Sequence, residues 1–284
     1  MPITITEPAE VRRMLGDPDL LVPEADAASE RANERFRSAS SRFVNGERHD
    51  LRRRWIEERL AALDVSALAE TAAALTRRAG STPSHVIART VPVECLAAQL
   101  GFADPPALPR LVAAVAAAYP TGEASDAADA AAARLLAAAP VAAITTTTTS
   151  TSSLDVQLLV QAHLATAALI EGALRAVHDE PSLGTSAALL RTLHRTPPVP
   201  ATRRIRPDGE VLLLPLTELE AAHAGGTEST PPLAFGAGDR ACPAPAHAFA
   251  ISAAVVGVLR ERGRARASDA ASDHARTSHD GSLR

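Results

Sequence analysis

The sequence predicts a mainly helical fold with small β-sheets. Apolar residues recur at the three-to-four-residue spacing of amphipathic helices along most of the chain, whereas stretches typical of strands are few and short. Hydrophobic residues make up 46% of the 284 residues but aromatic residues only 2%, so we expect a core of Ala, Leu and Val. No break in composition divides the chain, which predicts one folded domain over residues 1–262.

The expected elements follow from these patterns in order. Helical spacing is found at residues 9–15, 50–63, 65–78, 93–100, 108–118, 126–139 and 156–177, and again in an apolar run that ends near Leu259. Short strands are expected at residues 3–6, 199–205 and 210–214. After Leu259 the mixture of Arg, Ala, Ser and Asp offers little to bury, so residues 263–284 are predicted to form a disordered tail.

Composition and charge exclude several classes of function. The formal charge of −4 and the pI near 6.1 argue against nucleic acid as a partner. All 29 residues counted as Lys or Arg are arginine, which excludes Schiff-base chemistry on lysine. Cys95 and Cys242 lie in dissimilar surroundings, so no disulfide is indicated, and Cys95 is expected in the core. The first residues lack the pattern of a signal peptide, which predicts a cytoplasmic protein.

A glycine-rich loop delivers a cysteine to the start of the last apolar run. Residues 235–242 read Phe-Gly-Ala-Gly-Asp-Arg-Ala-Cys. A cysteine at a helix start is expected to have a lowered pKa because of the backbone dipole, which suits a thiolate ligand to haem iron. With the pattern Phe-x-x-Gly-x-Arg-x-Cys-x-Gly, the loop resembles the cysteine-ligand loop of the cytochromes P450 at Phe235, Gly238, Arg240 and Cys242, with Ala244 in the place of the last glycine. A buried cysteine in a glycine-rich turn is the alternative interpretation.

Two other segments resemble the parts of that family that bind the haem propionates. His49 and Arg53 are four residues apart, so they share one face of a predicted helix. Arg203 follows a proline-rich passage that must end a helix and continue as an extended strand. The resemblance implies that these three residues and Arg240 bind the propionates. For the helix, an arginine-rich face that is merely solvated is the alternative.

The same region departs from the family in one respect. The Glu-x-x-Arg pair of the P450 K helix is broken, since Ala188 precedes Arg191 by three residues and Thr192 precedes Arg195 by three. A buried arginine without its carboxylate costs several kcal/mol unless another group compensates.

A long apolar segment at residues 154–174 is predicted to be a central buried helix. Polar residues interrupt it too often for a membrane span. It resembles the P450 I helix, with Leu164 in the place of the acid and Ala165 in the place of the oxygen-activating threonine. Thr166 is then the nearest hydroxyl and the candidate catalytic residue, with a packing role as the alternative. His163 is expected to be an ordinary helix histidine.

Two functions from different classes follow from the resemblance. The first is a haem-thiolate monooxygenase or peroxygenase of secondary metabolism that binds haem b through Cys242 and oxidises a small organic substrate. A ferredoxin-type partner would supply electrons, with Arg52, Arg54 and Arg260 as a docking surface. The second is a P450-fold auxiliary protein without oxygenase activity, which stabilises a partner enzyme such as a glycosyltransferase.

Overall fold

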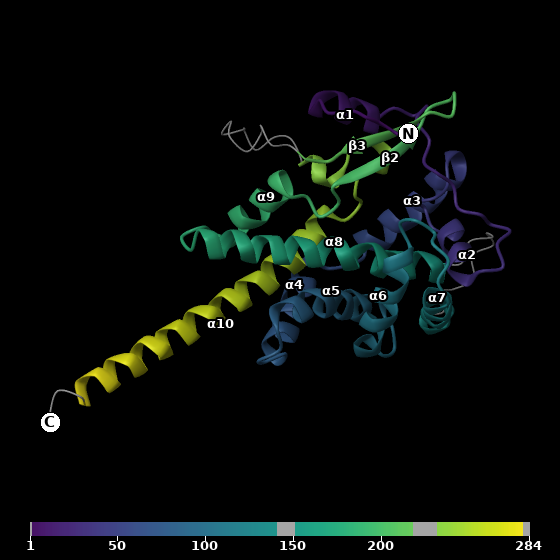
Figure 1. Ribbon diagram of the computed structural model, residues 1–284. Coiled ribbons are helices and arrows are strands. Elements are labelled where there is room, and N and C mark those ends of the chain that lie inside the picture. The colour runs from purple at the N-terminus through teal and green to yellow at the C-terminus, as the bar shows by residue number, and fades with distance from the viewer. Residues whose placement is uncertain (1, 141–150, 218–231, 281–284) are drawn as a thin grey trace.

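The computed structural model describes residues 2–140, 151–217 and 232–280, and it is mainly helical as predicted (Figure 1). The helices and strands lie in the following order: β1 (Ile3–Thr4), α1 (Pro8–Leu15), α2 (Ala32–Ala39), α3 (Gly46–Ala61), α4 (Val65–Arg78), α5 (Ser84–Leu100), α6 (Leu108–Ala118), α7 (Asp126–Ala138), α8 (Thr151–Asp179), α9 (Thr185–Arg195), β2 (Ala201–Ile205), β3 (Val211–Pro215) and α10 (Pro245–Asp280). Three short 3₁₀ turns, at Pro105–Ala107, Leu233–Phe235 and Gly238–Arg240, complete the order.

Helix α8 runs through the centre of the molecule and organises the main core. Helices α4 to α7 lie on one side of it, and α9 and the small sheet lie on the other (Figure 1). The core cluster consists largely of Ala, Leu, Val and Ile, as the composition predicted. Cys95 is fully buried within it, and its thiol donates to the Leu68 carbonyl at 3.1 Å, so the prediction of a core residue is confirmed.

The three strands form one small sheet in the order β1-β3-β2. Strand β1 pairs parallel to β3, and β2 pairs antiparallel to β3 with Arg203 opposite Leu213 and Arg204 opposite Leu212. Apolar residues of α1 and β3, among them Met14 and Leu212, form a second, smaller core cluster. The sheet therefore places β2 on the side of α8 that faces away from helices α4 to α7 (Figure 1).

Four helices differ from the predicted ranges: α2, α5, α9, which no predicted range covers, and α10. Helix α2 was missed because its eight residues carry a single large apolar residue, Phe36. Helix α5 begins at Ser84, nine residues before the predicted start, and continues through Pro92. Pro92 is tolerated in spite of the hydrogen bond that its missing N–H cannot make, because its side chain is buried against the core.

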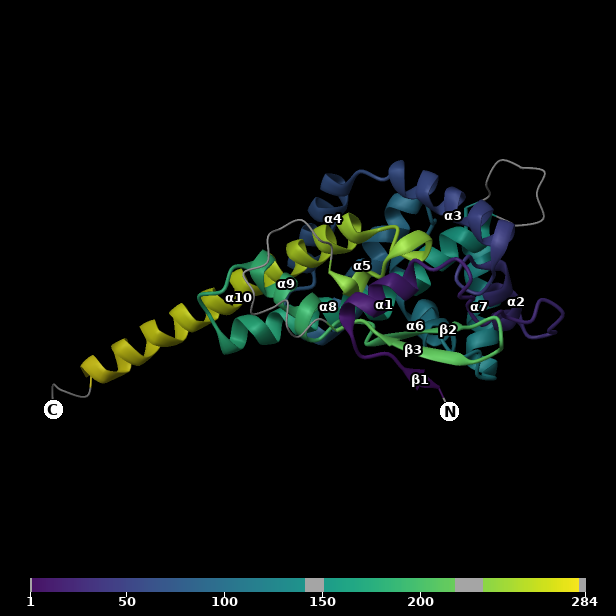
Figure 2. The same ribbon diagram turned by 90° about the horizontal axis from the view of Figure 1, so that it is seen from above.

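Helix α10 extends beyond the body of the protein towards the C-terminus (Figure 2). The prediction ended this helix near Leu259 and left residues 263–284 disordered, whereas the helix runs to Asp280. The prediction was based on burial alone. Alanine and arginine are strong helix formers even where nothing is buried, which accounts for the difference.

Within residues 2–140, 151–217 and 232–280, two helices are long and apolar enough to cross a membrane, judged by length and composition only. They are Ser152–Asp179, whose apolar stretch is 72% buried inside the protein, and Gly238–Arg266, whose apolar stretch is 28% buried. The first is the central core helix. The Thr-rich tract at 145–150 and the segment 218–231 lie outside the described residues.

Candidate functional site

One large cavity of about 580 Å³ brings together most of the residues that the sequence singled out. It is enclosed by α3, α8, β2, the start of α10 and the loop that precedes it. Seven of the eight predicted site residues line it: His49, Arg53, Thr166, Arg203, Phe235, Arg240 and Cys242. Segments that are nearly two hundred residues apart in the sequence therefore meet at one site.

The loop from Phe235 to Cys242 closes on itself and presents the cysteine to the cavity. The Cys242 N–H donates to the Phe235 carbonyl at 2.6 Å, and Gly236 makes the turn with a φ of 74°. Burial raises the pKa of the Cys242 thiol, with smaller opposing effects from a backbone hydrogen bond near Ala244 and from Arg53. The expectation of a dipole-lowered pKa was wrong for the free protein, because α10 begins only at Pro245 and burial outweighs its dipole.

Gly238 is the one predicted site residue that does not line the cavity. It has a φ of 68°, and a Cβ built on it would lie 2.6 Å from the Gly16 Cα and 3.0 Å from the Leu15 carbonyl oxygen. The glycine is thus required where the cysteine loop passes the end of α1, not where it would approach a flat ligand. Its contribution to the site is to hold the loop in place.

Three arginines and a histidine gather on the wall beside Cys242. The Arg53 guanidinium donates to the Ala241 carbonyl at 2.5 Å, and Arg240 donates to the Val44 carbonyl at 2.8 Å. Burial, Arg240 and Arg53 lower the pKa of His49, and a hydrogen bond to neighbouring Asp50 partly opposes them. The charge of Arg240 therefore acts on His49.

Arg204 is the fourth member and was missed by the sequence prediction. It is only 5% exposed, and burial together with the charges of Arg240 and Arg42 lowers its pKa to about 10. Its guanidinium donates to the Thr202 hydroxyl and the Arg203 carbonyl and, among the described residues, has no carboxylate partner. The side chains of Arg203 and Arg204 lie on opposite faces of β2, yet both residues border the cavity.

The cavity wall fits haem by its charge. Six arginines line it, and none of the described residues that line it is an aspartate or glutamate. A buried guanidinium without an acid is costly, and a ligand carboxylate relieves that cost. Haem b offers two propionates for the cations and an iron for the thiolate, so Arg204, Arg240, Arg53 and Cys242 form a suitable donor set.

The α8 wall of the cavity is chemically different. It presents Gln157, Gln161, Ala165 and Thr166, together with apolar residues, and none of its described lining residues is ionisable. Leu164 is 46% exposed, and it does not border the cavity.

His163 lies away from the cavity, buried at the contact between α8 and α5. Burial and the charge of Arg89 lower its pKa, while a hydrogen bond to the Arg89 backbone opposes them. It is therefore a neutral packed histidine.

The broken Glu-x-x-Arg pair leaves no orphaned charge on α9. Ala188 and Thr192 are buried, whereas Arg191 pairs with Glu180 at 2.7 Å and Arg195 is exposed. The predicted cost of an unpaired buried arginine does not arise, because small or neutral side chains occupy the buried positions.

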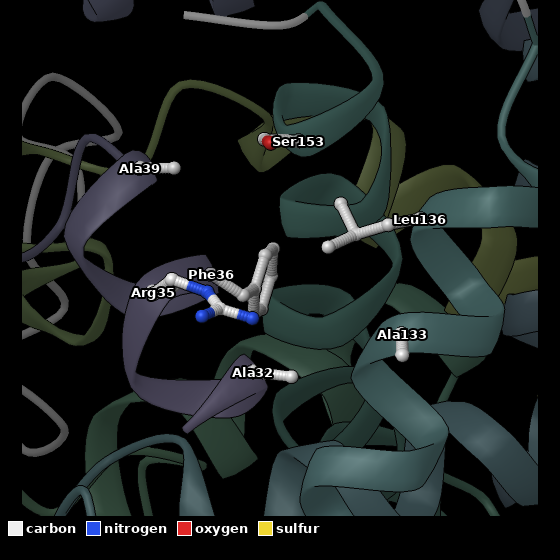
Figure 3. Close-up of a pocket in the computed structure, with 7 residues that line it drawn as sticks. All are labelled: Ala32, Arg35, Phe36, Ala39, Ala133, Leu136 and Ser153. Atoms are coloured by element: carbon white, nitrogen blue, oxygen red, sulfur yellow. The ribbon is translucent and has the colours of Figure 1, made fainter. Parts of the chain in front are cut away.

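A second cavity of about 330 Å³ lies between α2, α7 and the start of α8 (Figure 3). Phe36 and Leu136 border it, and Arg35 is its only charged residue. None of the residues that the sequence singled out lines this second cavity, so the first cavity remains the candidate site.

Comparison with known proteins shows the fold. No protein-family model and no curated protein sequence matches the chain. Among solved structures, P450BioI in complex with hexadec-9Z-enoic acid ligated acyl carrier protein matches with a TM-score of 0.70, 15% identity, 91% of this chain and 84% of that chain. Epothilone D-bound cytochrome P450epoK matches with a TM-score of 0.71, 17% identity, 91% of this chain and 83% of that one. Ligand-free CYP164A2 of Mycobacterium smegmatis matches with a TM-score of 0.68, 18% identity and the same two coverages.

Proposed function

Because the chain has the fold of the cytochromes P450, we propose that it is a haem-thiolate oxidoreductase that oxidises a small organic substrate. The observation that carries the proposal is the position of Cys242 in a cavity that is rich in arginine and lined by no described acid. A thiol beside unpaired cations is what a dianionic iron porphyrin requires.

We assign the residues as follows. Cys242 would bind the iron, and His49, Arg53, Arg203, Arg204 and Arg240 would bind the propionates. Haem held by a thiolate supplies oxygen activation, because donation from the sulfur favours cleavage of the O–O bond. The pKa of Cys242 is raised in the free protein, so binding of the iron would release the thiol proton.

Thr166 is the only hydroxyl that the middle of α8 offers to the cavity, and we assign it the role of hydrogen-bond donor beside the reacting oxygen. Its hydroxyl has no ionisable neighbour on the α8 wall. Proton delivery from this wall would therefore be slow, because general acid catalysis needs a group that can be protonated again after it has donated its proton. Oxidation driven by peroxide depends less on such delivery than oxidation driven by electron transfer.

A ferredoxin-type protein remains the proposed electron donor, but the docking surface needs revision. Arg52 donates to the Ser38 and Ser40 carbonyls at 2.6 and 2.9 Å, and burial lowers its pKa. It therefore supports the connection between α2 and α3. Arg54 is exposed, and Arg260 donates to the Thr185 hydroxyl at 3.0 Å, so Arg54 is the better candidate.

The haem content of the protein purified from cells supplied with a haem precursor tests the proposal. We expect about one haem per chain in the parent and in Cys95→Ala, which removes the buried cysteine that lies outside the cavity. Cys242→Ala should lose most of the haem. A parent that is folded and colourless, or a Cys242→Ala variant that keeps its haem unchanged, would contradict the proposal.

The auxiliary-protein function is the second candidate, and the α8 wall is the observation that favours it. A protein that stabilises a glycosyltransferase or a similar enzyme needs the fold but no proton relay. Stable co-purification with such an enzyme, together with no oxidation under electron-driven or peroxide-driven conditions, would favour it over the oxidoreductase.

A further inference from the structure

The cavity is lined by more arginines than the propionate assignment uses. Of the six arginines that line it, Arg37 pairs with Glu34 and Arg53 pairs with Glu57. The remaining four form no ion pair within the described part of the chain; they are Arg42, Arg203, Arg204 and Arg240. Arg42 and Arg203 are exposed, whereas Arg204 is buried and Arg240 is half-buried. The propionates are assigned to residues other than Arg42, which leaves Arg42 at the cavity without an assigned anion.

Arg42 differs from the other three in its position. It follows Ser41, whose N–H donates to the Gln157 side-chain oxygen at 2.9 Å, while the Gln157 amide donates to the Ser41 hydroxyl at 2.8 Å. This pair of hydrogen bonds fixes the connection between α2 and α3 against the first half of α8. Gln157 precedes Ala165 by eight residues, which corresponds to about 12 Å along a helix.

The charge of Arg42 acts on the interior of the cavity. It lowers the pKa of buried Arg204, and it opposes the burial that raises the pKa of Tyr119. Tyr119 accepts a hydrogen bond from Gln161 of α8 at 3.0 Å. Within the described residues Arg42 has no hydrogen-bond or ion-pair partner; its guanidinium lies 5.7 Å from the centre of the Phe43 ring.

The lining between Arg42 and the middle of α8 is mainly apolar, with the amides of Gln157 and Gln161 among its polar groups. Phe43, Leu158, Ala162, Pro92 and Leu96 border this part of the cavity. An apolar passage that ends at an unpaired arginine suits a ligand with an apolar body and one anionic end.

We infer that the substrate carries a carboxylate that pairs with Arg42, and that its apolar remainder extends along α8 towards Ala165 and Thr166. The statement that this ligand is the substrate rests on the proposed function, whereas its binding can be measured whether or not haem is present. Arg42 is thereby a specificity-determining residue, separate from the cations beside Cys242.

Octanoate and octanamide form a matched pair of probes, because they share a length and differ in charge. We would titrate each by calorimetry into the full-length protein, in its haem-loaded and haem-free forms. The parent should bind octanoate roughly tenfold more tightly than octanamide, the effect of one charge-assisted pair. Arg42→Gln should abolish the preference for octanoate and leave the affinity for octanamide unchanged. Arg42→Lys should keep part of the preference. Arg35→Gln, at an exposed arginine outside this cavity, is the control and should keep the full preference.

Three results would overturn the inference. The first is a parent that binds octanoate no more tightly than octanamide, including a parent that binds neither. The second is an Arg42→Gln variant that weakens both probes equally, which would make Arg42 a packing residue. The third is loss of haem from Arg42→Gln, which would assign this arginine to the propionates. Failure of the proposed function shows separately, as a parent without haem.

Discussion

The two walls of the cavity differ in the functional groups that their side chains carry. The wall formed by α3, β2 and the cysteine loop carries a thiol, four arginines, a histidine and a loop held by specific backbone contacts. The wall formed by α8 carries small and apolar residues, two glutamines and one threonine. The first set suits the binding of an anionic iron cofactor, and the second lacks the groups that move protons. Under the proposed function, binding of the cofactor would therefore be separable from catalysis on it.

The largest expected effect concerns the cationic wall. Removal of two cations in Arg204→Gln with Arg240→Gln should weaken haem binding by about 10²- to 10⁴-fold, since each charge-assisted contact contributes roughly 1.5–3 kcal/mol. Hemin titration followed by absorbance measures the effect. The free protein should not lose stability to the same extent, because Arg240 lowers the pKa of Arg204 and the substitution relieves that repulsion. Arg35→Gln with Arg54→Gln, at two exposed positions, is the control, and equal haem loss in both variants would contradict the assignment.

The next effect tests how the cysteine loop is held. Gly238→Ala should destabilise the protein by about 1–3 kcal/mol from its positive φ, and by more from the close approach to Gly16. Gly209→Ala shares the positive φ but has nothing within 4 Å of its Cβ, so it should show the φ effect alone. Urea unfolding of the two variants separates the contributions. Equal losses would mean that the contact between the loop and α1 is unimportant.

These two cases also show what the sequence could and could not predict. The cysteine loop was recognisable because its residues are local, and six of the helices were predicted within a few residues of their bounds. Arg204 was not recognisable, because the adjacent arginines of β2 pair with Leu213 and Leu212 of the same strand, β3, and nothing in the pattern says which arginine is buried. The close approach of Gly238 to Gly16 depends on contacts between distant segments, which local patterns do not contain.

A smaller effect is expected from pH. The pKa of His49 is lowered by burial and by Arg240 and Arg53, so the unfolded chain binds its proton first as the pH falls below about 6.5. The free protein should therefore lose stability as the pH falls from about 6.5 through the lower pKa of the folded state. His49→Gln should remove part of this dependence in thermal melts across that range. If the variant keeps the pH dependence of the parent, then His49 is protonated as readily in the folded protein as in the unfolded chain, which would contradict the prediction.

The smallest effect is expected on the α8 wall. Leu164→Glu with Ala165→Thr supplies an acid and an alcohol, but Leu164 is 46% exposed, so a glutamate there would be largely solvated. Product formed per electron consumed should rise only a few-fold, well below the roughly 10²- to 10⁴-fold of a positioned general acid. Peroxide-driven turnover is the internal comparison and should change less. A large gain in electron-driven coupling would mean that the contrast between the walls has been overstated.

The absorbance spectrum of the reduced protein under carbon monoxide tests the central claim most directly, because the position of the Soret band reports the ligand opposite the gas. We predict the red-shifted band of a thiolate complex in the parent and in Cys95→Ala, and its loss in Cys242→Ala. An unshifted band that persists in Cys242→Ala and disappears in a variant of His247, another side chain on the cavity wall, would contradict the account.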